Sequence, residues 1–311
     1  MNENSINPWI DEYLTSLKVR NFAKRTVTEI RRKLGKFTLY LENQGVIHID
    51  HITNKTILTY QGELYHTLNT KGRPNTASHQ NNMLVAVKQF TRFLYERGYL
   101  VSDPSRGIPY AKEPQRLPRS VLTPTEAKKI IHTPDTTSAI GYRDRTILEV
   151  LYTTGIRKEE VNNLTIHDVD YTQGILRILE GKGRKDRIVP IGKIACRYLE
   201  NYITSVRPEL IKDPVNSHLF LSLRGNRLSK NMVWKLVKKY AKKAKIRKNV
   251  HPHTFRHTCA TTMLKNKADI NTVRKLLGHE SLATTQIYAH LTITDLKDVH
   301  KRCHPREKDK Q

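Results

Sequence analysis

The stretch "LGHESLATTQIYAH", residues 277–290, contains two side chains that suit phosphate chemistry, His279 and Tyr288. Glycine is the residue type that most often ends a helix, so Gly278 predicts that His279 directly follows a helix terminus. A tyrosine oxygen can act as a nucleophile and form a covalent phosphoester. A single tyrosine late in a domain more often belongs to the core or the surface, so its meaning depends on the rest of the chain.

Upstream stretches supply the groups that such a nucleophile needs. They are Arg157 in "TTGIRKEE" (153–160), Lys182 at the tip of a predicted hairpin in "EGKGRKDR" (180–187), and His253 and Arg256 in "HPHTFRH" (251–257). Arginine neutralises phosphate oxygens bidentately, because its planar guanidinium matches their geometry. Histidine and lysine can serve as the base for a phenol and the acid for a leaving alkoxide. Singly, each residue has a plainer interpretation as a surface salt bridge, a solvated lysine or a helix cap. Together they predict a site for cleaving a phosphodiester.

The sequence does not favour a metal centre or a nucleotide cofactor. His251, His253 and His257 are close enough to be considered as a metal trio, but no carboxylate lies near them in the sequence. Arg256 falls three residues after His253, on the same helical face, where a guanidinium would repel a cation. No cluster of acidic residues suits two-metal hydrolysis, and "GKGRKDR" lacks the spacing of a phosphate-binding P-loop. We therefore expect a phosphate site without metal and without cofactor.

The chain is strongly basic, with 55 Lys plus Arg against 29 Asp plus Glu and a formal charge of +26. Such a surplus favours a polyanionic partner, nucleic acid before an anionic membrane. Residues 214–268 contain fourteen Lys plus Arg and no acidic residue, which predicts a phosphate-binding face rather than an ordinary solvated one. The candidate DNA-binding residues on a predicted helix at 229–246 and in the N-terminal part are Lys235, Lys238, Lys239, Lys242, Lys243, Arg31 and Arg32.

Apolar spacing and turn residues predict a mainly helical protein with a small β-hairpin or sheet. The predicted parts are a helical domain at 1–104, a linker at 105–121, a second domain at 122–300 and a basic polar tail at 301–311. The stretch "DPSRGIPYAKEPQRLPRS" at 103–120, which includes most of the linker, holds four prolines, which exclude regular helix. The linker suits either a clamp around a polyanion or a plain tether. Helix N-caps are predicted at Thr26, Thr123 and Ser229, and "ILRIL" and "RIVPI" predict the two strands of the hairpin.

The compartment is predicted from what the sequence lacks. No apolar run reaches the length of a signal peptide or of a membrane span. The three cysteines, Cys196, Cys259 and Cys303, are scattered and odd in number, which argues against a disulfide framework. We expect a cytoplasmic, nucleoid-associated protein that does not bind a membrane.

These motifs resemble those of the tyrosine recombinases, or phage integrase family, and the chain looks most similar to the Xer-type members. The first stretch is close to the signature of that group, and "HTFRH" matches the H-x-x-R-H box, with Phe255 where leucine is commoner. "TGIRKEEV" matches the first arginine box and "GKGRKDR" the hairpin lysine. The resemblance covers essentially the whole chain. It implies a SAM-like core-binding domain and a catalytic domain that together close as a C-shaped clamp on DNA.

The resemblance also implies a role for each residue. Tyr288 would attack the scissile phosphate and leave a 3′-phosphotyrosine and a 5′-hydroxyl. Arg157 and Arg256 would clamp the non-bridging oxygens. The remaining roles are implied for Lys182 as the acid for the leaving oxygen, His253 as the base, His279 as a hydrogen-bond donor to the phosphate, and Glu160 as an acid that orients the site. For Glu160 an exposed helix charge is the plainer interpretation.

The expected function is therefore site-specific DNA recombination by a homotetramer on double-stranded DNA with inverted half-sites. Two alternatives stay open: a type IB topoisomerase, which shares the chemistry, and a non-catalytic DNA-binding protein. The stretch after Tyr288 would dock either onto a neighbouring subunit or onto its own. The sequence does not choose between chromosome dimer resolution and a phage, plasmid or transposon enzyme, although its high lysine content mildly favours a mobile element. Nor does it identify the target DNA, because charge reports phosphate contacts and not base contacts.

Overall fold

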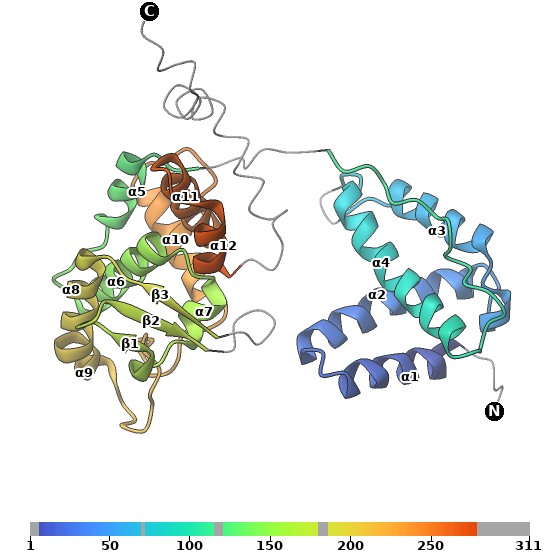
Figure 1. Ribbon diagram of the computed structural model, residues 1–311, viewed down its shortest axis with the longest axis horizontal. Coiled ribbons are helices and arrows are strands. Elements are labelled where there is room, and N and C mark those ends of the chain that lie inside the picture. The colour runs from blue at the N-terminus through green and yellow to red at the C-terminus, as the bar shows by residue number, and fades with distance from the viewer. Residues whose placement is uncertain (1–5, 70–71, 115–120, 180–185, 279–311) are drawn as a thin grey trace, which may run out of the picture. The chain divides into compact units, whose positions relative to one another are not determined.

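The chain divides into two compact units, Met1–Gln115 and Arg116–Gln311 (Figure 1). The computed structural model describes residues 6–69, 72–114, 121–179 and 186–278. Within these ranges, no helix has both the length and the apolar character needed to cross a bilayer.

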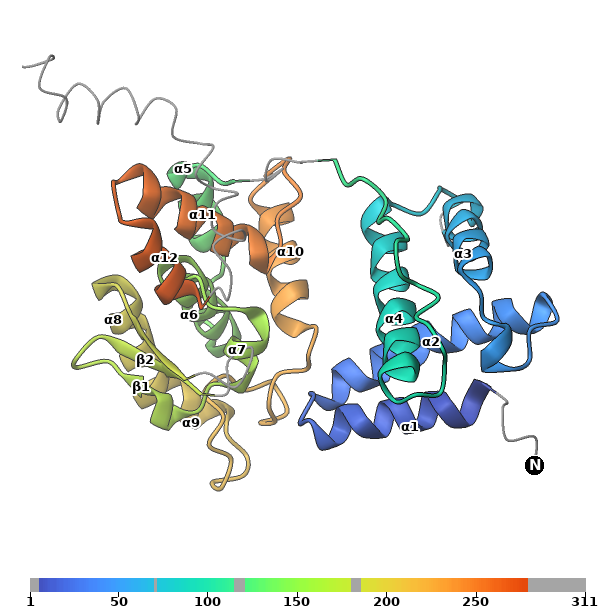
Figure 2. The same cartoon turned by 45° about the vertical axis from the view of Figure 1, so that its right-hand side comes forward.

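The N-terminal unit is helical, as predicted. Its elements are α1 (Ile6–Val19), α2 (Lys24–Asn43), a 3-10 turn (Ile49–His51), α3 (Asn54–His66) and α4 (Ala77–Glu96). Figure 2 shows α1 beside α2, with α4 packed against both. Apolar residues at helical spacing meet in one core, in which Phe37 and Phe90 are fully buried. The periodicity therefore identified the buried faces correctly.

The predicted N-cap at Thr26 is wrong. Helix α2 begins at Lys24, and Ala23, which precedes it, offers no capping side chain. Lysine and arginine are good helix formers, so residues 24 and 25 extend the helix backwards and place Thr26 inside its first turn.

The first part of the proline-rich segment is held against the N-terminal unit. Ile108 is buried in the core of that unit. Asn81 Nδ2 donates to the carbonyl of Ala111 (2.9 Å), and Gln61 Nε2 donates to the carbonyl of Pro109 (3.0 Å). Residues 105–114 contain no helix or strand, since prolines remove backbone donors and side chains of α3 and α4 satisfy the carbonyls instead.

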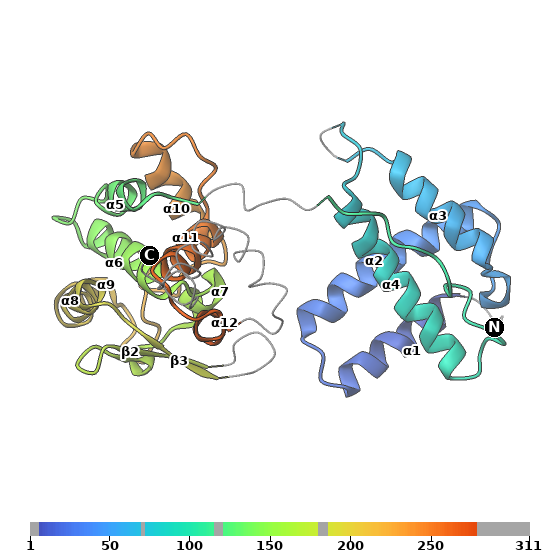
Figure 3. The ribbon, with the colours of Figure 1, turned by 45° about the horizontal axis from the view of Figure 1, so that its top comes forward.

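The C-terminal unit surrounds one central helix (Figures 1 and 3). Its helices are α5 (Pro124–Ile131), α6 (Ala139–Thr154), α7 (Lys158–Asn163), α8 (Lys193–Asn201), α9 (Arg207–Leu210), α10 (Met232–Lys243), α11 (Pro252–Lys265) and α12 (Ile270–Leu277), with a π-helical turn at Tyr202–Val206 and a 3-10 turn at Ile166–Asp168. Helix α6 lies in the middle, with α5, α10 and α11 on one side and the sheet on the other. Thr123 caps α5 in a capping box with Glu126, as predicted.

Because α6 is enclosed, its charged side chains are buried as pairs. Arg143 pairs with Asp144 at 2.5 Å, and Arg145 pairs with Glu149 at 2.8 Å. The hydroxyl of Tyr240 on α10 donates to Asp144 (2.9 Å). A buried charge needs such partners, because desolvation without them costs several kcal/mol. Both pairs lie within α6. The bond from Tyr240, and one from Arg143 Nη1 to the carbonyl of Leu221 (2.6 Å), join the helix to its neighbours and fix its rotation.

The sheet has three antiparallel strands in the order β1 (Val169–Asp170), β2 (Ile175–Ile178) and β3 (Arg187–Pro190). Leu176 faces Val189 across the pair, and both are fully buried. The predicted hairpin is thereby confirmed for its two strands. Its predicted tip, with Gly181, Lys182 and Gly183, lies outside the described residues.

Helix α10 presents the predicted apolar face to the core, but its predicted N-cap at Ser229 is wrong. The backbone N–H of Met232 donates to the carbonyl of Ser229 (2.9 Å) and closes a turn, so the helix begins only at Met232. A local turn has therefore replaced the first helical turn that the sequence pattern predicted.

Two glycines in the left-handed conformation end helices α6 and α12. Gly155 (φ 60°) follows α6, and Gly278 (φ 65°) follows α12. A Cβ built on Gly155 would lie 2.8 Å from Cδ2 of Leu277 and 3.3 Å from Cβ of Cys259, both of which are buried. Only glycine meets both the backbone and the packing requirement at this position.

Replacing Gly155 with alanine should therefore destabilise the C-terminal unit. Strained backbone costs about 1–2 kcal/mol and overpacking about 1–3 kcal/mol more, measured as the free energy of unfolding in urea. Gly174→Ala is the matched control, since Gly174 also has positive φ but a Cβ there would meet only ordinary contacts at 3.5 and 3.6 Å. Equal losses for the two variants would show that packing at residue 155 is not tight.

Candidate active site

Arg157 and Glu160 form a closed pair at the start of α7. The backbone N–H of Arg157 donates to Oε2 of Glu160 (2.7 Å), and Arg157 Nη1 donates to Oε1 (3.0 Å). Glu160 is only 8% exposed, so it is not an exposed helix charge. The pair holds Arg157 directly after Gly155 and Ile156, at the end of α6.

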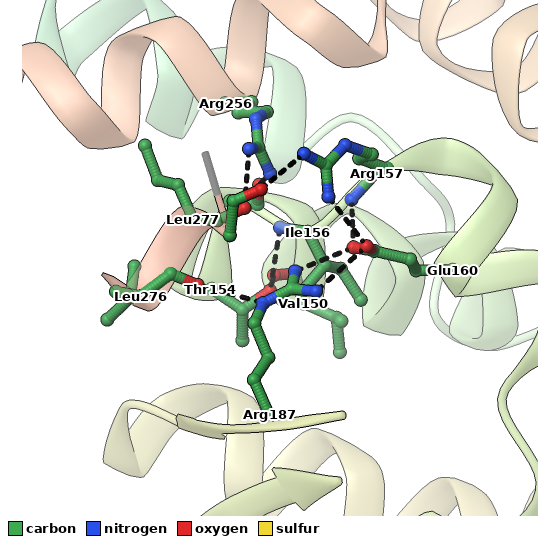
Figure 4. A network of polar contacts seen from close by, with 11 residues as sticks. Val150, Thr154, Ile156, Arg157, Glu160, Arg187, Arg256, Leu276 and Leu277 are labelled. Carbon is green, nitrogen blue, oxygen red and sulfur yellow. Dashed lines mark hydrogen bonds and ion pairs between the residues drawn. The ribbon is translucent and has the colours of Figure 1, made fainter. Parts of the chain in front are cut away.

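A third residue, Arg187, completes this pair from β3. Its Nη1 and Nη2 donate to Oε1 (2.9 Å) and Oε2 (2.8 Å) of Glu160, and its Nε donates to the carbonyl of Leu276 (3.1 Å). Figure 4 shows Glu160 between the two guanidiniums. In the sequence, this arginine was predicted only to be the first residue of a strand. The position of this charged residue, at the start of a strand in a partly buried hairpin, was the one feature of the sequence that could have indicated its role.

The charges around Glu160 determine its protonation. Burial alone would raise the pKa of the carboxyl, but hydrogen bonds from Arg187 and from the Arg157 backbone, together with both positive charges, lower the pKa below its usual value. Glu160 is therefore a carboxylate at neutral pH.

Arg256 joins two helix ends from α11. Its Nη1 donates to the carbonyl of Gly155 (2.8 Å), at the end of α6, and its Nη2 donates to the carbonyl of Leu277, at the end of α12 (Figure 4). The side chain is only 5% exposed. A helix C-terminus carries unpaired carbonyls and partial negative charge, both of which favour a cation there.

Three successive carbonyls at the end of α12 thus bind three different arginines. The carbonyls of Leu276, Leu277 and Gly278 accept hydrogen bonds from Arg187 Nε, Arg256 Nη2 and Arg157 Nη2 respectively, the last at 2.7 Å. The arginines come from β3, α11 and the turn between α6 and α7. The structure therefore brings together Arg157, Glu160 and Arg256, three of the candidate site residues, and adds Arg187.

His253 lies one helical turn before Arg256 on α11, with an exposed edge. The protein atoms around the ring, and then the charge of Arg256, lower the pKa of its imidazole. The charge of Glu159 raises this pKa, and the charges of Lys158 and Arg157 lower it. The imidazole ring therefore lies near the start of α7. A lowered pKa keeps His253 neutral at pH 7, the form in which histidine can accept a proton.

The neighbouring histidines are also neutral. Burial of the imidazole lowers the pKa of His257 to about 4, and electrostatic repulsion from His253 and His251 adds to this shift. In the part of the chain that the structure describes, no three His, Cys, Asp or Glu side chains are grouped as a metal site.

Three of the predicted site residues, Lys182, His279 and Tyr288, lie outside the described residues. Their sequence positions still relate them to the cluster. His279 directly follows Gly278, whose carbonyl binds Arg157, and Lys182 belongs to the connection between β2 and β3, the strand that carries Arg187.

The predicted DNA-binding lysines lie on α10. Lys235, Lys239, Lys242 and Lys243 are exposed, and none of them forms an ion pair with a carboxylate among the described residues. Lys238 bonds to Asn249 and lies 5.6 Å from the ring centre of Trp234. An exposed basic helix of this kind is electrostatically suited to a phosphate backbone.

Arg31 and Arg32 belong to the other unit, on α2, and each has an acidic partner. Arg31 pairs with Asp11 (2.7 Å) and Arg32 with Glu29 (3.0 Å). Both pairs are exposed, and such pairs contribute only about 0–1 kcal/mol, so they do not prevent phosphate binding.

Comparison with known proteins defines the class. Residues 120–294 match the phage integrase family, and residues 10–98 match the phage integrase N-terminal SAM-like domain. The chain belongs to the phage integrase family of tyrosine recombinases, which cut and rejoin DNA. The predicted fold class and enzyme class are confirmed.

Within this family the chain is similar to Xer recombinases. It is 37% identical to tyrosine recombinase XerD of Staphylococcus haemolyticus over 298 residues, which cover 96% of this chain and 98% of that protein. The crystal structure of XerA recombinase is 31% identical, with a TM-score of 0.52 and coverage of 96% and 99%. The Tn1549 transposon integrase in complex with a circular intermediate DNA is 18% identical, covers 94% and 99%, and shares the fold with a TM-score of 0.72.

Replacing Glu160 with glutamine should lower the free energy of unfolding by about 3 kcal/mol at neutral pH, because two arginines lose their carboxylate. The folded-state pKa of Glu160 lies below its unfolded value of about 4.3. Its contribution is therefore present above that pH and is lost as the pH falls through the folded-state pKa. Urea unfolding of wild type and Glu160→Gln should show the difference shrinking with acidification.

The control for this variant is Glu159→Gln, since Glu159 is half exposed and pairs only loosely with Lys158 (3.5 Å). It should change the stability little at any pH. A Glu160→Gln loss that stays constant down to acid pH would contradict the assignment of Glu160 as a buried carboxylate.

Proposed function

We propose that Arg157 and Arg256 bind the non-bridging oxygens of one scissile phosphate, and that Tyr288 attacks its phosphorus. The observation that carries this proposal is the charge of the cluster. Two guanidiniums, those of Arg157 and Arg187, share one carboxylate, Glu160, so this group of three keeps one net positive charge in a partly buried place. The α12 C-terminus offsets only about half a charge, so an anion would complete the balance.

Arg157 retains donors with which to bind that anion. A guanidinium carries five N–H donors. Contacts of the Arg157 side chain within the described residues use one donor toward Glu160 and one toward Gly278. Fixed donors of this kind stabilise the charge that develops on a phosphate in the transition state without reorganising.

The remaining roles are those that the family resemblance implies, and they balance the protons of the reaction. As the Tyr288 oxygen forms its bond to phosphorus, the phenol proton passes to neutral His253. The bond from phosphorus to the 5′-oxygen breaks, and Lys182 supplies a proton to that oxygen, while His279 donates a hydrogen bond to the phosphate. The reverse steps rejoin the strand. The phosphotyrosine retains the energy of the broken bond, so no nucleotide is consumed.

At the level of the assembly, we expect a homotetramer on two DNA duplexes, each with inverted half-sites, in the cytoplasm. Two similar folds support this expectation. One is a lambda integrase tetramer bound to a Holliday junction, and the other is XerH bound to a palindromic difH substrate. The reaction would serve chromosome dimer resolution or the integration and excision of a mobile element.

The decisive test is a covalent trap. Wild-type protein incubated with nicked genomic DNA of its source organism and quenched with SDS should yield a protein–DNA adduct at Tyr288, identified by mass spectrometry, on one recurring sequence. Tyr288→Phe should abolish the adduct, because no oxygen remains to bond phosphorus.

Tyr65→Phe serves as the control for this trap, since Tyr65 is an exposed tyrosine on α3 and should leave the adduct unchanged. An adduct on scattered sequences, with relaxation of plasmids by monomer, would replace the proposal with a topoisomerase. DNA binding without any adduct would indicate a non-catalytic module.

The role of α10 in binding can be measured separately. Replacing Lys235, Lys239, Lys242 and Lys243 with glutamine should reduce the slope of log affinity against log salt concentration by up to about 0.9 for each phosphate that the helix no longer neutralises. Lys193→Gln, on α8, is the control and should leave the slope unchanged. An unchanged slope in the fourfold variant would remove α10 from the DNA-binding face.

A further inference from the structure

The carboxylate of Glu160 is shared equally between two arginines. Oε1 accepts from Arg157 Nη1 (3.0 Å) and Arg187 Nη1 (2.9 Å), while Oε2 accepts from the Arg157 backbone N–H (2.7 Å) and Arg187 Nη2 (2.8 Å). Two-pronged contacts from both sides fix the plane of the carboxylate. Arg157 therefore owes its orientation to a group that Arg187 holds in place.

Arg187 is itself fixed on a second side. Its Nε bonds to the carbonyl of Leu276, and a Cβ built on Gly278 would lie 3.2–3.3 Å from the Nε, Cδ and Cζ atoms of Arg187. The end of α12 thus packs on the guanidinium. The side chain is 12% exposed, so solvent does not compete strongly for these bonds.

Arg187 also changes the charge that Arg157 presents to a ligand. With Arg157 alone, the carboxylate of Glu160 would neutralise the guanidinium that is meant to bind a phosphate. With two arginines sharing one carboxylate, the group of three keeps a net positive charge. Since Coulomb energies are larger in a partly buried place than in water, this residual charge is effective there.

We infer that Arg187 is a positioning residue, which orients Arg157 through Glu160 and preserves its charge for the scissile phosphate. This inference rests on the proposed role of Arg157 as a phosphate clamp. Because Arg187 begins β3 and binds α12, it also couples the base of the hairpin that leads to Lys182 with the segment that leads to His279.

The test uses Arg187→Lys, which keeps the charge but cannot form the two-pronged contact. On the DNA captured by the covalent trap, the single-turnover rate of adduct formation should fall by about 10–100-fold, the size expected for a misplaced catalytic group. The dissociation constant for DNA should change little, while the thermal midpoint should fall, because buried Glu160 loses its two-pronged partner. Arg177→Lys, an exposed arginine on the neighbouring strand β2, is the matched control and should keep the wild-type rate.

Two further measurements separate positioning from a general loss of structure. Combining Arg187→Lys with Glu160→Gln should slow the reaction no more than the slower single variant, because both act on one contact. A methylphosphonate at the scissile position, which lacks one charged oxygen, should reduce the deficit of Arg187→Lys. A wild-type rate for Arg187→Lys, or rate reductions that multiply in the double variant, would overturn the inference.

The Nε–Hε signal of Arg157 in NMR gives an answer that does not depend on cleavage. In Arg187→Lys this signal should shift and broaden, while the signal of Arg143, buried on α6, should stay unchanged. An unchanged Arg157 signal would overturn the inference even if no adduct forms. The absence of an adduct at Tyr288 in the wild type would instead refute the proposed function.

Discussion

The hydrogen bonds from Arg256 to two helix ends are the interaction on which the C-terminal unit depends. The Arg256 guanidinium donates one hydrogen bond to the carbonyl of Gly155, directly after α6, and one to the carbonyl of Leu277, the last residue of α12. These carbonyls would otherwise be buried without partners, which costs about 1–3 kcal/mol each. A glycine with positive φ follows both helices, and the bond to the carbonyl of Gly155 holds the turn that leads to Arg157. The stability of this unit and the geometry of the proposed phosphate site therefore depend on the same contacts.

Much of this arrangement was predictable from the sequence because it is encoded locally. Apolar spacing identified the buried faces of α2, α4 and α10, and glycine at 155 identified the end of α6. The clustering of Arg157 with Arg256 followed from the chemistry of phosphate rather than from any local rule. The family comparison confirmed the fold class that the motifs implied.

The parts that escaped prediction depend on tertiary contacts. Arg187 appears in the sequence as an ordinary basic residue at a strand start, and its partner Glu160 lies far from it along the chain. The N-caps at Thr26 and Ser229 failed for a related reason, since extra helical residues in one case and a backbone turn in the other moved the helix start. A capping motif indicates which residue types favour a helix start, but the residues on either side determine at which position the helix begins.

The three consecutive carbonyls at the end of α12 have a consequence for how this segment can vary in length. An α-helix turns by about 100° per residue. Inserting or deleting one residue within α12 would rotate its terminal carbonyls away from Arg157, Arg187 and Arg256, all of which are anchored elsewhere. Substitutions at the exposed positions of α12 should thus be tolerated, whereas changes in its number of residues should not. The number of residues in α12 therefore fixes the positions of the carbonyls that hold the three arginines.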